Sequence, residues 1–194
     1  MRDYQYTFTV FSPCYNCEKT VHRVYESLCA QTYRDFEWVA LNDGSTDRTL
    51  DVLRKYQQEA GFPMQVIDVQ PNRGKPHGLN RGVSAARGEF FLPLDGDDGC
   101  VKESLEVLLR SWQGIPKDRR SVFRGVVCHC KDEKGQRVGD SFPRSPWDVK
   151  NLDVTFRRRI EGEKWGFVRT DIMKAFPFPE VDHYVPESTV WLPC

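Results

Sequence analysis

Three aspartates lie close together directly after an apolar run near the middle of the chain. Residues Phe90 to Gly99 read FFLPLDGDDG, so Asp95, Asp97 and Asp98 fall within four positions. Carboxylates held this close repel one another unless a cation lies among them, and oxygen ligands suit hard cations such as Mn²⁺ and Mg²⁺. The spacing therefore predicts a Mn²⁺ or Mg²⁺ site. The alternative is a solvated turn that precedes a helix capped by an aspartate.

Other motifs that bind cations or phosphates fit this chain poorly. An EF-hand loop that began at Asp95 would have Gly99 in a ligand position and Cys100 in place of the glycine that permits its turn. A haloacid-dehalogenase-type phosphatase places Asp-x-Asp after its first strand, whereas three strand-like segments precede this one. Gly74-Lys75 lacks the other residues of a Walker loop, and no Gly-x-Gly-x-x-Gly is present. The phosphates of a bound nucleotide would therefore depend on a metal ion.

Alternating strand-like and helix-like segments must position these aspartates. Aromatic and β-branched runs predict strands over residues 6–11, 36–41, 64–69 and 90–94. Apolar residues at helical spacing predict helices over residues 18–31, from Ser45 or Thr46 to 60, and over 79–86, with Asn16 as the cap of the first. The alternation predicts an α/β fold, a Rossmann-like and mostly parallel sheet with helices on both faces.

Polar segments follow each of the four predicted strands. They read SPCYN, NDGSTD, NRG and DGDD, in chain order. In open α/β sheets, ligands bind outside the carboxyl ends of the strands. The sequence therefore predicts that the polar chemistry of the first half converges on one edge of the sheet.

The second half of the chain is less regular. Residues 122–130 and 164–169 read as strands, 131–144 as a turn-rich excursion, and 170–175 as a helix before a proline-rich stretch. The chain shows no internal repeat and no linker to a second domain. We therefore expect a single domain over residues 1–194.

Composition narrows the partners and the cellular location. The 194 residues include 28 basic and 28 acidic side chains, so there is no global basic footprint and we expect no nucleic-acid partner. No apolar stretch approaches the roughly 20 residues that cross a bilayer, and the N-terminus does not resemble a signal peptide. Seven cysteines form an odd set, which favours free thiols and a cytoplasmic protein.

Two groups of cysteines have the residue types of a zinc site. They are Cys14-x-x-Cys17 and Cys128-His129-Cys130, which lie more than a hundred positions apart and have unusual spacing in the second group. Buried small residues at the ends of strands are the favoured interpretation.

Four motifs, taken in order and at approximate spacing, resemble a known family. FSPCYN, NDGSTD, NRG…LNRG…ARGEFFLPLDGDD and a late VPES are similar to the inverting nucleotide-sugar glycosyltransferases of family 2, which have the GT-A fold. The resemblance implies a nucleotide-binding half over residues 1–100 and an acceptor-side half over 101–194 that is truncated at its C-terminus. It also implies metal-dependent transfer from a UDP-sugar to a glycan or lipid-linked acceptor in polysaccharide biosynthesis, with peripheral membrane association through further segments.

The resemblance assigns roles around the nucleotide. Pro13, Tyr15 and Asn16 match the loop that packs around the base, Asp43 the carboxylate that hydrogen-bonds it, and Arg73 a basic residue beside it. Each position also has a local alternative. Asp43 could form an Asx-turn, Asn16 a helix cap and Tyr15 part of the core, while Arg73 could be a solvated loop charge.

The same resemblance assigns the acidic turn to the rest of the donor. Asp95 and Asp97 match the family's Asp-x-Asp motif, which contacts the ribose and holds the metal on the diphosphate. Asp97 is the firmest metal ligand of the set, and Asp95 serves either the ribose or the metal. Asp98 either shares the coordination or only caps the following helix.

Sugar transfer also needs a base that removes the proton of the acceptor hydroxyl. Glu187 in VPES matches the late acidic residue of related members and is the candidate, with Asp182 and Glu180 in reserve. His183 reads as a loop histidine. More common members carry an Asp-bearing pair at this point, and an idle carboxylate at a helix N-terminus is the other interpretation of Glu187. Two alternative functions are another nucleotide-dependent transferase, such as a nucleotidyltransferase, and a non-catalytic nucleotide-sugar-binding domain.

Overall fold

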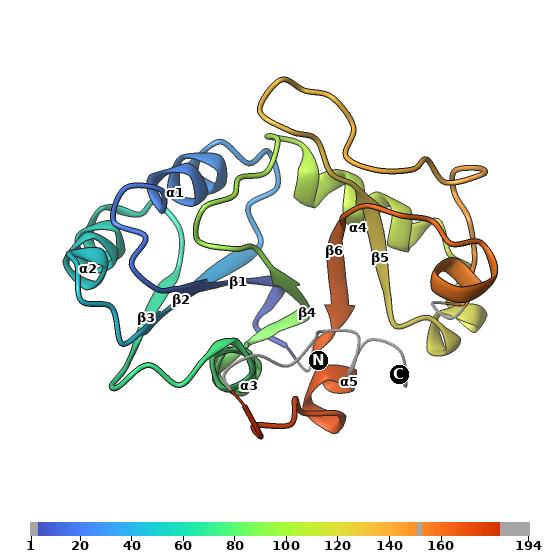
Figure 1. The fold of residues 1–194 in the computed structure, drawn as a ribbon. Coiled ribbons are helices and arrows are strands. Elements are labelled where there is room, and N and C mark those ends of the chain that lie inside the picture. Colours follow the sequence, from blue (N-terminus) through green and yellow to red (C-terminus); the bar gives the residue numbers. More distant parts are fainter. Residues whose placement is uncertain (1–3, 151–152, 183–194) are drawn as a thin grey trace.

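A computed structural model of the chain describes residues 4–150 and 153–182, which form a six-stranded sheet (Figure 1). The strands are β1 (Tyr6–Cys14), β2 (Phe36–Asp43), β3 (Met64–Val69), β4 (Gly88–Pro93), β5 (Gly125–His129) and β6 (Lys164–Arg169). Their order across the sheet is β3-β2-β1-β4-β6-β5. The first four strands pair in parallel, whereas β6 pairs antiparallel with both β4 and β5.

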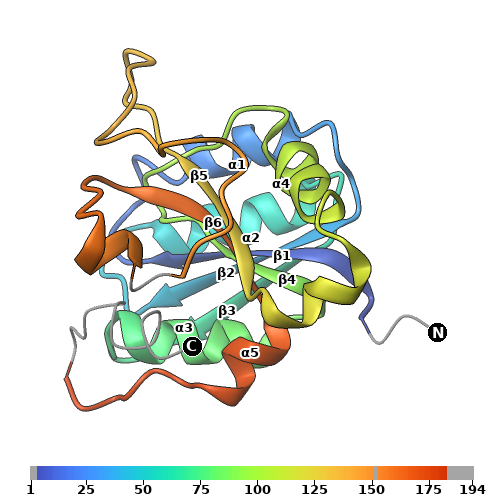
Figure 2. The same ribbon diagram turned by 90° about the vertical axis from the view of Figure 1, so that its right-hand side faces the viewer.

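Helices cover both faces of the sheet (Figure 1). On one face lie α1 (His22–Cys29), α2 (Thr49–Glu59) and α4 (Ser104–Gln113), and on the other α3 (Lys75–Ala85) and α5 (Thr170–Ala175). The 3₁₀ helix η1 (Lys117–Val122) precedes β5, and the π-helical turn η2 (Asp153–Arg157) lies in the long connection from β5 to β6, which extends away from the sheet (Figure 2). None of the helices in residues 4–150 and 153–182 is long and apolar enough to span a membrane.

The central strands are buried on both faces, which explains their nearly continuous apolar sequences. Along β1, Phe8 and Val10 pack in the cluster beneath α1, α2 and α4, while Phe11 points into the cluster beneath α3 and α5. On β2, Trp38 and Val39 divide between the two faces in the same way. The two-residue period of a strand thus supplies two cores from one sheet.

The predicted α/β fold and the mostly parallel sheet of the first half are confirmed. The bounds of β3, β6 and α5 agree with the predicted ranges 64–69, 164–169 and 170–175. The structure also confirms an irregular stretch after β5, which contains a turn-rich excursion closed by an isolated bridge between Lys131 and Arg137.

Three details of the predicted helices are wrong. Helix α1 begins at His22, and Asn16 does not cap it because its side chain bonds the neighbouring loop instead. Neither Ser45 nor Thr46 caps α2; the Asp47 carboxylate accepts the Thr49 N–H at 2.9 Å just before that helix. Helix α3 begins at 75, four residues earlier than predicted, because Pro76 is well suited to a first helical turn.

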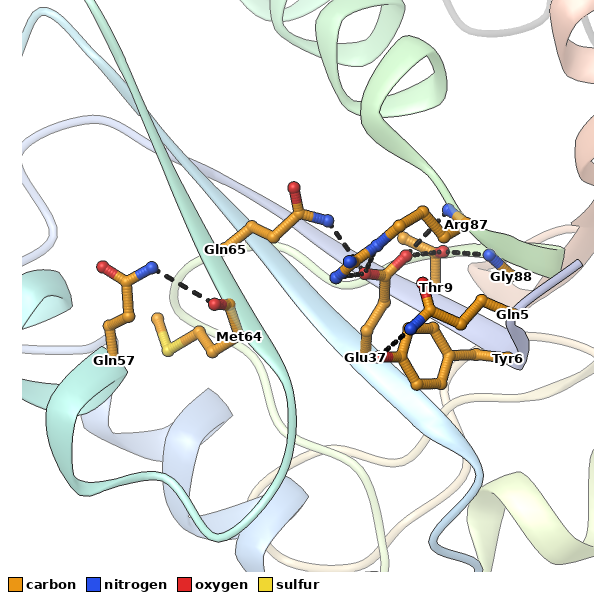
Figure 3. A network of polar contacts seen from close by, with 9 residues as sticks. All are labelled: Gln5, Tyr6, Thr9, Glu37, Gln57, Met64, Gln65, Arg87 and Gly88. Atoms are coloured by element: carbon orange, nitrogen blue, oxygen red, sulfur yellow. Dashed lines mark hydrogen bonds and ion pairs between the residues drawn. The ribbon is translucent and has the colours of Figure 1, made fainter.

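A buried carboxylate near the amino end of β2 joins this strand to β1 and β3 (Figure 3). Glu37 on β2 is completely buried. Its oxygens accept hydrogen bonds from Thr9 Oγ1, from Gln65 Nε2 and from the backbone and guanidinium of Arg87, each at 2.8 Å, with Arg87 Nη2 at 2.6 Å. Every oxygen of this buried charge is thus paired, as burial of a charge requires.

We expect Glu37→Gln to lower the free energy of unfolding by about 3 kcal/mol, because it removes the charge and turns an N–H₂ toward donors. Urea unfolding measures the change. The control is Glu59→Gln, which breaks the exposed pair with Lys55 (3.9 Å) and should cost less than about 0.5 kcal/mol. Equal losses in the two variants would contradict this account of the network.

Candidate functional site

The loop after β1 is joined to the loop after β2 through Asn16. The Asn16 side-chain oxygen accepts the backbone N–H of Thr46 at 2.8 Å and of Asp47 at 3.4 Å, and the Asn16 N–H donates to Ser45 Oγ at 3.0 Å. Asn16 has a positive φ of 50°, a conformation that asparagine tolerates better than most residues. The first two polar segments therefore form one surface at the carboxyl ends of β1 and β2.

Two further hydrogen bonds join the loops after β1 and β2. Asp47 Oδ2 accepts the Glu18 N–H at 3.1 Å, and Glu18 Oε2 accepts the Arg48 N–H at 3.0 Å. Burial alone would raise the pKa of Asp47, but hydrogen bonds from the Thr49 hydroxyl and N–H and from the Glu18 N–H outweigh it and lower that pKa. Asp47 therefore stays ionised and holds the two loops together.

The loop after β3 is clamped by Asp43, the last residue of β2. One carboxylate oxygen of Asp43 accepts the Arg73 N–H and the other the Gly74 N–H, both at 2.8 Å, while its carbonyl accepts Asn72 Nδ2 at 2.8 Å. Gly44 has a φ of 67°, and a Cβ there would lie 2.3 Å from the Asn72 nitrogen. Only glycine permits this approach of the two loops. The hydrogen bonds from Asp43 then fix the backbone of Arg73 and the start of α3.

The acidic turn packs closely on the loop after β1. A Cβ on Gly96 would lie 3.2 Å from both Cys17 Sγ and the Pro13 carbonyl oxygen, so the turn lies directly on that loop. Thr20 Oγ1 donates to the Gly96 carbonyl at 3.2 Å, and Arg23 Nη1 donates to the Asp97 carbonyl at 3.3 Å. The position of the turn is thus set by α1 and the residues before it.

The three carboxylates of the turn have different surroundings. Asp95 Oδ2 lies 3.0 Å from Lys75 Nζ, whereas Asp97 and Asp98 are exposed. Partial desolvation of its carboxyl group, together with the negative charges of Asp97, Asp95 and Glu163, nevertheless raises the pKa of Asp98. The turn therefore concentrates negative charge at the edge of the sheet, beside one lysine.

The described residues supply only part of a coordination shell for a divalent cation at this turn. Within residues 4–150 and 153–182, no three His, Cys, Asp or Glu side chains are placed to hold a metal ion by themselves, and this applies to the cysteine groups as well. Mg²⁺ and similar hard ions commonly bind one or two carboxylates plus substrate phosphates. Asp97 and Asp95, at an exposed edge, match that donor set.

A cleft of about 310 Å³ lies between the loop after β3 and the segment after α5. Its lining residues are Asn72, Arg73, Glu180, Val181 and Asp182. The cleft therefore places the predicted basic residue, Arg73, opposite two of the acidic residues considered as bases.

Glu180 is attached to α3 by two hydrogen bonds. Its oxygens lie 2.8 Å from Asn80 Nδ2 and 2.8 Å from His77 Nδ1. These bonds, first that from Asn80 and then that from His77, lower the pKa of Glu180. Asn80 also exchanges hydrogen bonds with the backbone N–H and carbonyl of Phe178. The segment that forms one wall of the cleft is thus held on α3.

Most of the predicted donor-site residues share this edge of the sheet. Pro13 lies at the end of β1 beside the acidic turn, and Asn16 lies in the following loop and bonds the loop after β2. Tyr15 is 54% exposed, so it is not part of the core. Glu187 and His183 lie outside the described residues. Sequence reasoning missed Lys75, His77 and Asn80. The three-residue spacing of His77 and Asn80 on one helix face is a signal that could have paired them.

Comparisons with known proteins agree with this geometry. The model of Glycosyl transferase family 2 matches residues 9–178. The chain is 32% identical to the putative glycosyltransferase EpsE of Bacillus subtilis (strain 168) over 138 residues, which cover 71% of this chain and 49% of EpsE. It is 35% identical to the chondroitin synthase of Pasteurella multocida (strain Pm70) over 104 residues, which cover 54% of this chain and 11% of that protein.

A solved structure extends the similarity to the fold. The crystal structure of S. aureus TarS 1-349 in complex with UDP matches with a TM-score of 0.67 and 27% identity, over 90% of this chain and 50% of that chain. This chain therefore spans half or less of the length of each of these three proteins.

The lowered pKa of Glu180 gives a test of the wall of the cleft. Because the pKa is lower in the folded chain, the stability that Glu180 contributes is present above the ordinary glutamate pKa and is lost as the pH falls through the lowered value. We expect Asn80→Ala to raise this pKa toward the ordinary value, as measured by carbon NMR of the carboxyl group. Glu59 in the same titration is the reference. An unchanged Glu180 pKa in Asn80→Ala would contradict the assignment.

Proposed function

The chain belongs to glycosyl transferase family 2, and we propose that, with the GT-A fold, it transfers a sugar from a nucleotide sugar to an acceptor hydroxyl with inversion at the anomeric carbon. The observation that carries the proposal is the meeting of Asp43, Arg73 and Asp95 at one sheet edge. UDP is the favoured nucleotide, because TarS is described in complex with UDP. A glycan or lipid-linked acceptor, polysaccharide biosynthesis and a cytoplasmic location complete the proposal, and chondroitin synthase among the relatives supports the glycan.

The base of the nucleotide binds beside Asp43 and Arg73 in this proposal. A carboxylate has about four lone-pair sites, so Asp43 can still accept an N–H of uracil while it holds the Arg73 and Gly74 N–H groups. Arg73 lines the cleft and offers hydrogen bonds to the carbonyl oxygens of the base. Tyr15 offers an exposed ring for packing, and Pro13 and Asn16 support the loop that carries it.

The acidic turn holds the ribose and the diphosphate in this proposal. Asp97 and Asp95 would bind Mn²⁺ or Mg²⁺ together with phosphate oxygens, and Asp98 lies next to them. When bound, the cation supplies stabilisation of the negative charge that develops on the leaving diphosphate. The chain contributes by presenting these carboxylates on a turn that α1 and the loop after β1 hold in place.

Glu187 is the proposed base that accepts the proton of the acceptor hydroxyl. Glu180, one of the two reserves, is a weaker base than an ordinary glutamate because hydrogen bonds from Asn80 and His77 lower its pKa, and a general base works best when its pKa lies near the operating pH. Asp182 lines the same cleft as Arg73. These features assign Glu180 to holding the wall of the cleft.

We expect UDP to stabilise the protein only when Mn²⁺ is present. At a UDP concentration of a hundred times the dissociation constant, the gain is about 2.7 kcal/mol, or about 5 to 10 °C in Tm. Asp97→Asn should lose the gain, whereas Asp51→Asn, an exposed acidic residue of α2, should keep it. Equal stabilisation by UDP in EDTA would refute metal-dependent binding at this turn.

Slow hydrolysis of a UDP-sugar tests catalysis against binding alone. We expect Glu187→Gln to lower the rate by about 10²-fold or more, the usual contribution of a general base, while UDP binding stays intact. Glu180→Gln is the matched control and should keep the rate within a few-fold. If Glu187→Gln hydrolyses at the wild-type rate and Glu180→Gln does not, the two roles are reversed.

A further inference from the structure

Lys75 makes an ion pair within the proposed donor site that the assigned roles do not explain. Its Nζ lies 3.0 Å from Asp95 Oδ2, and the two side chains are 35% and 41% exposed. The residues are twenty positions apart in the chain, at the start of α3 and just after β4. The pair therefore connects the loop after β3 to the acidic turn.

The position of Lys75 is unfavourable for helix α3. Its first turn contains no acidic residue and begins with this lysine. The positive end of the helix dipole repels a cation there. A partly exposed ion pair contributes at most about 1 kcal/mol, which does no more than offset that repulsion. Stability of the fold thus gives no reason for a lysine here.

The backbone that carries Lys75 is held firmly. Asp43 accepts the N–H groups of Arg73 and Gly74, the two residues just before it, and Gly74 has a φ of 85° that favours glycine. This fixed backbone directs the Lys75 side chain toward the acidic turn, where its Nζ lies 3.0 Å from Asp95 Oδ2.

We propose that Lys75 binds a phosphate of the donor, and that without donor it occupies Asp95 in place of the divalent cation. The inference rests on the proposed function. An ammonium group is a compact positive charge suited to phosphate. Its Nζ already lies within hydrogen-bond distance of a carboxylate assigned to the ribose or the cation. The diphosphate must lie beside that carboxylate and so within reach of Lys75.

Charge makes the binding of cation and nucleotide interdependent in this arrangement. The Lys75 ammonium would be repelled by a divalent cation held at Asp95 and would have to leave that carboxylate. A diphosphate supplies negative charge to both the cation and the ammonium. Lys75 therefore opposes binding of the metal alone and favours binding of the metal together with a nucleoside diphosphate.

Lys75→Gln tests both halves of the inference. The affinity for Mn²⁺ alone is measured by electron paramagnetic resonance, and the affinities for UDP and uridine at saturating Mn²⁺ by calorimetry. We expect Lys75→Gln to bind Mn²⁺ more tightly and UDP about tenfold more weakly, because a charge-assisted hydrogen bond is lost. Uridine, which lacks phosphate, should bind unchanged. Lys75→Arg should restore most of the UDP affinity, and Lys102→Gln, at a lysine paired with Glu103, should behave as wild type.

The outcomes separate the inference from the proposed function. If UDP and uridine weaken equally in Lys75→Gln, or UDP affinity does not change, Lys75 binds no phosphate and the inference is wrong. Weaker binding of Mn²⁺ alone in that variant would overturn the competition for Asp95. If wild-type protein does not bind UDP with Mn²⁺ at all, the proposed function fails and the inference fails with it.

Discussion

The carboxylate of Asp43 is the contact on which the arrangement of the site depends. It ends the buried strand β2 and accepts one backbone N–H from Arg73 and one from Gly74. Gly44 lets the two loops approach closely enough for this contact. The clamp sets where α3 begins, which in turn places Lys75 opposite Asp95 and His77 opposite Glu180. One buried charge thus positions a basic residue, a helix, the Lys75–Asp95 ion pair and the His77–Glu180 hydrogen bond.

The rest of the edge is assembled from side chains that bond the backbones of neighbouring loops. Asn16 holds the loop after β2, and Thr20 holds the acidic turn. At the opposite end of the sheet, Glu37 joins β2 to β1, β3 and the residue before β4. Asp43 and Glu37, the buried carboxylates at the two ends of β2, are thus both paired, and apolar clusters on the two faces fill the space between them.

The sequence predicted those features that depend on local pattern. Strand β3 and strand β6 have the predicted bounds, because each is a short run of apolar and β-branched residues between turn formers. The helix caps were wrong because Asn16 bonds a loop thirty residues away, and no local pattern reveals that partner. The same limit hid the partners of Glu37 and the close packing of Gly96 on Cys17.

The central claim is that a divalent cation and a nucleoside diphosphate bind together at the edge formed by Asp43, Arg73 and the acidic turn. Anomalous scattering from manganese in a crystal of the protein with UDP and Mn²⁺ tests it most directly. The account predicts a manganese peak coordinated by Asp97 and by diphosphate oxygens, with uracil beside Asp43. Manganese bound by other residues, or UDP bound elsewhere on the protein, would contradict it.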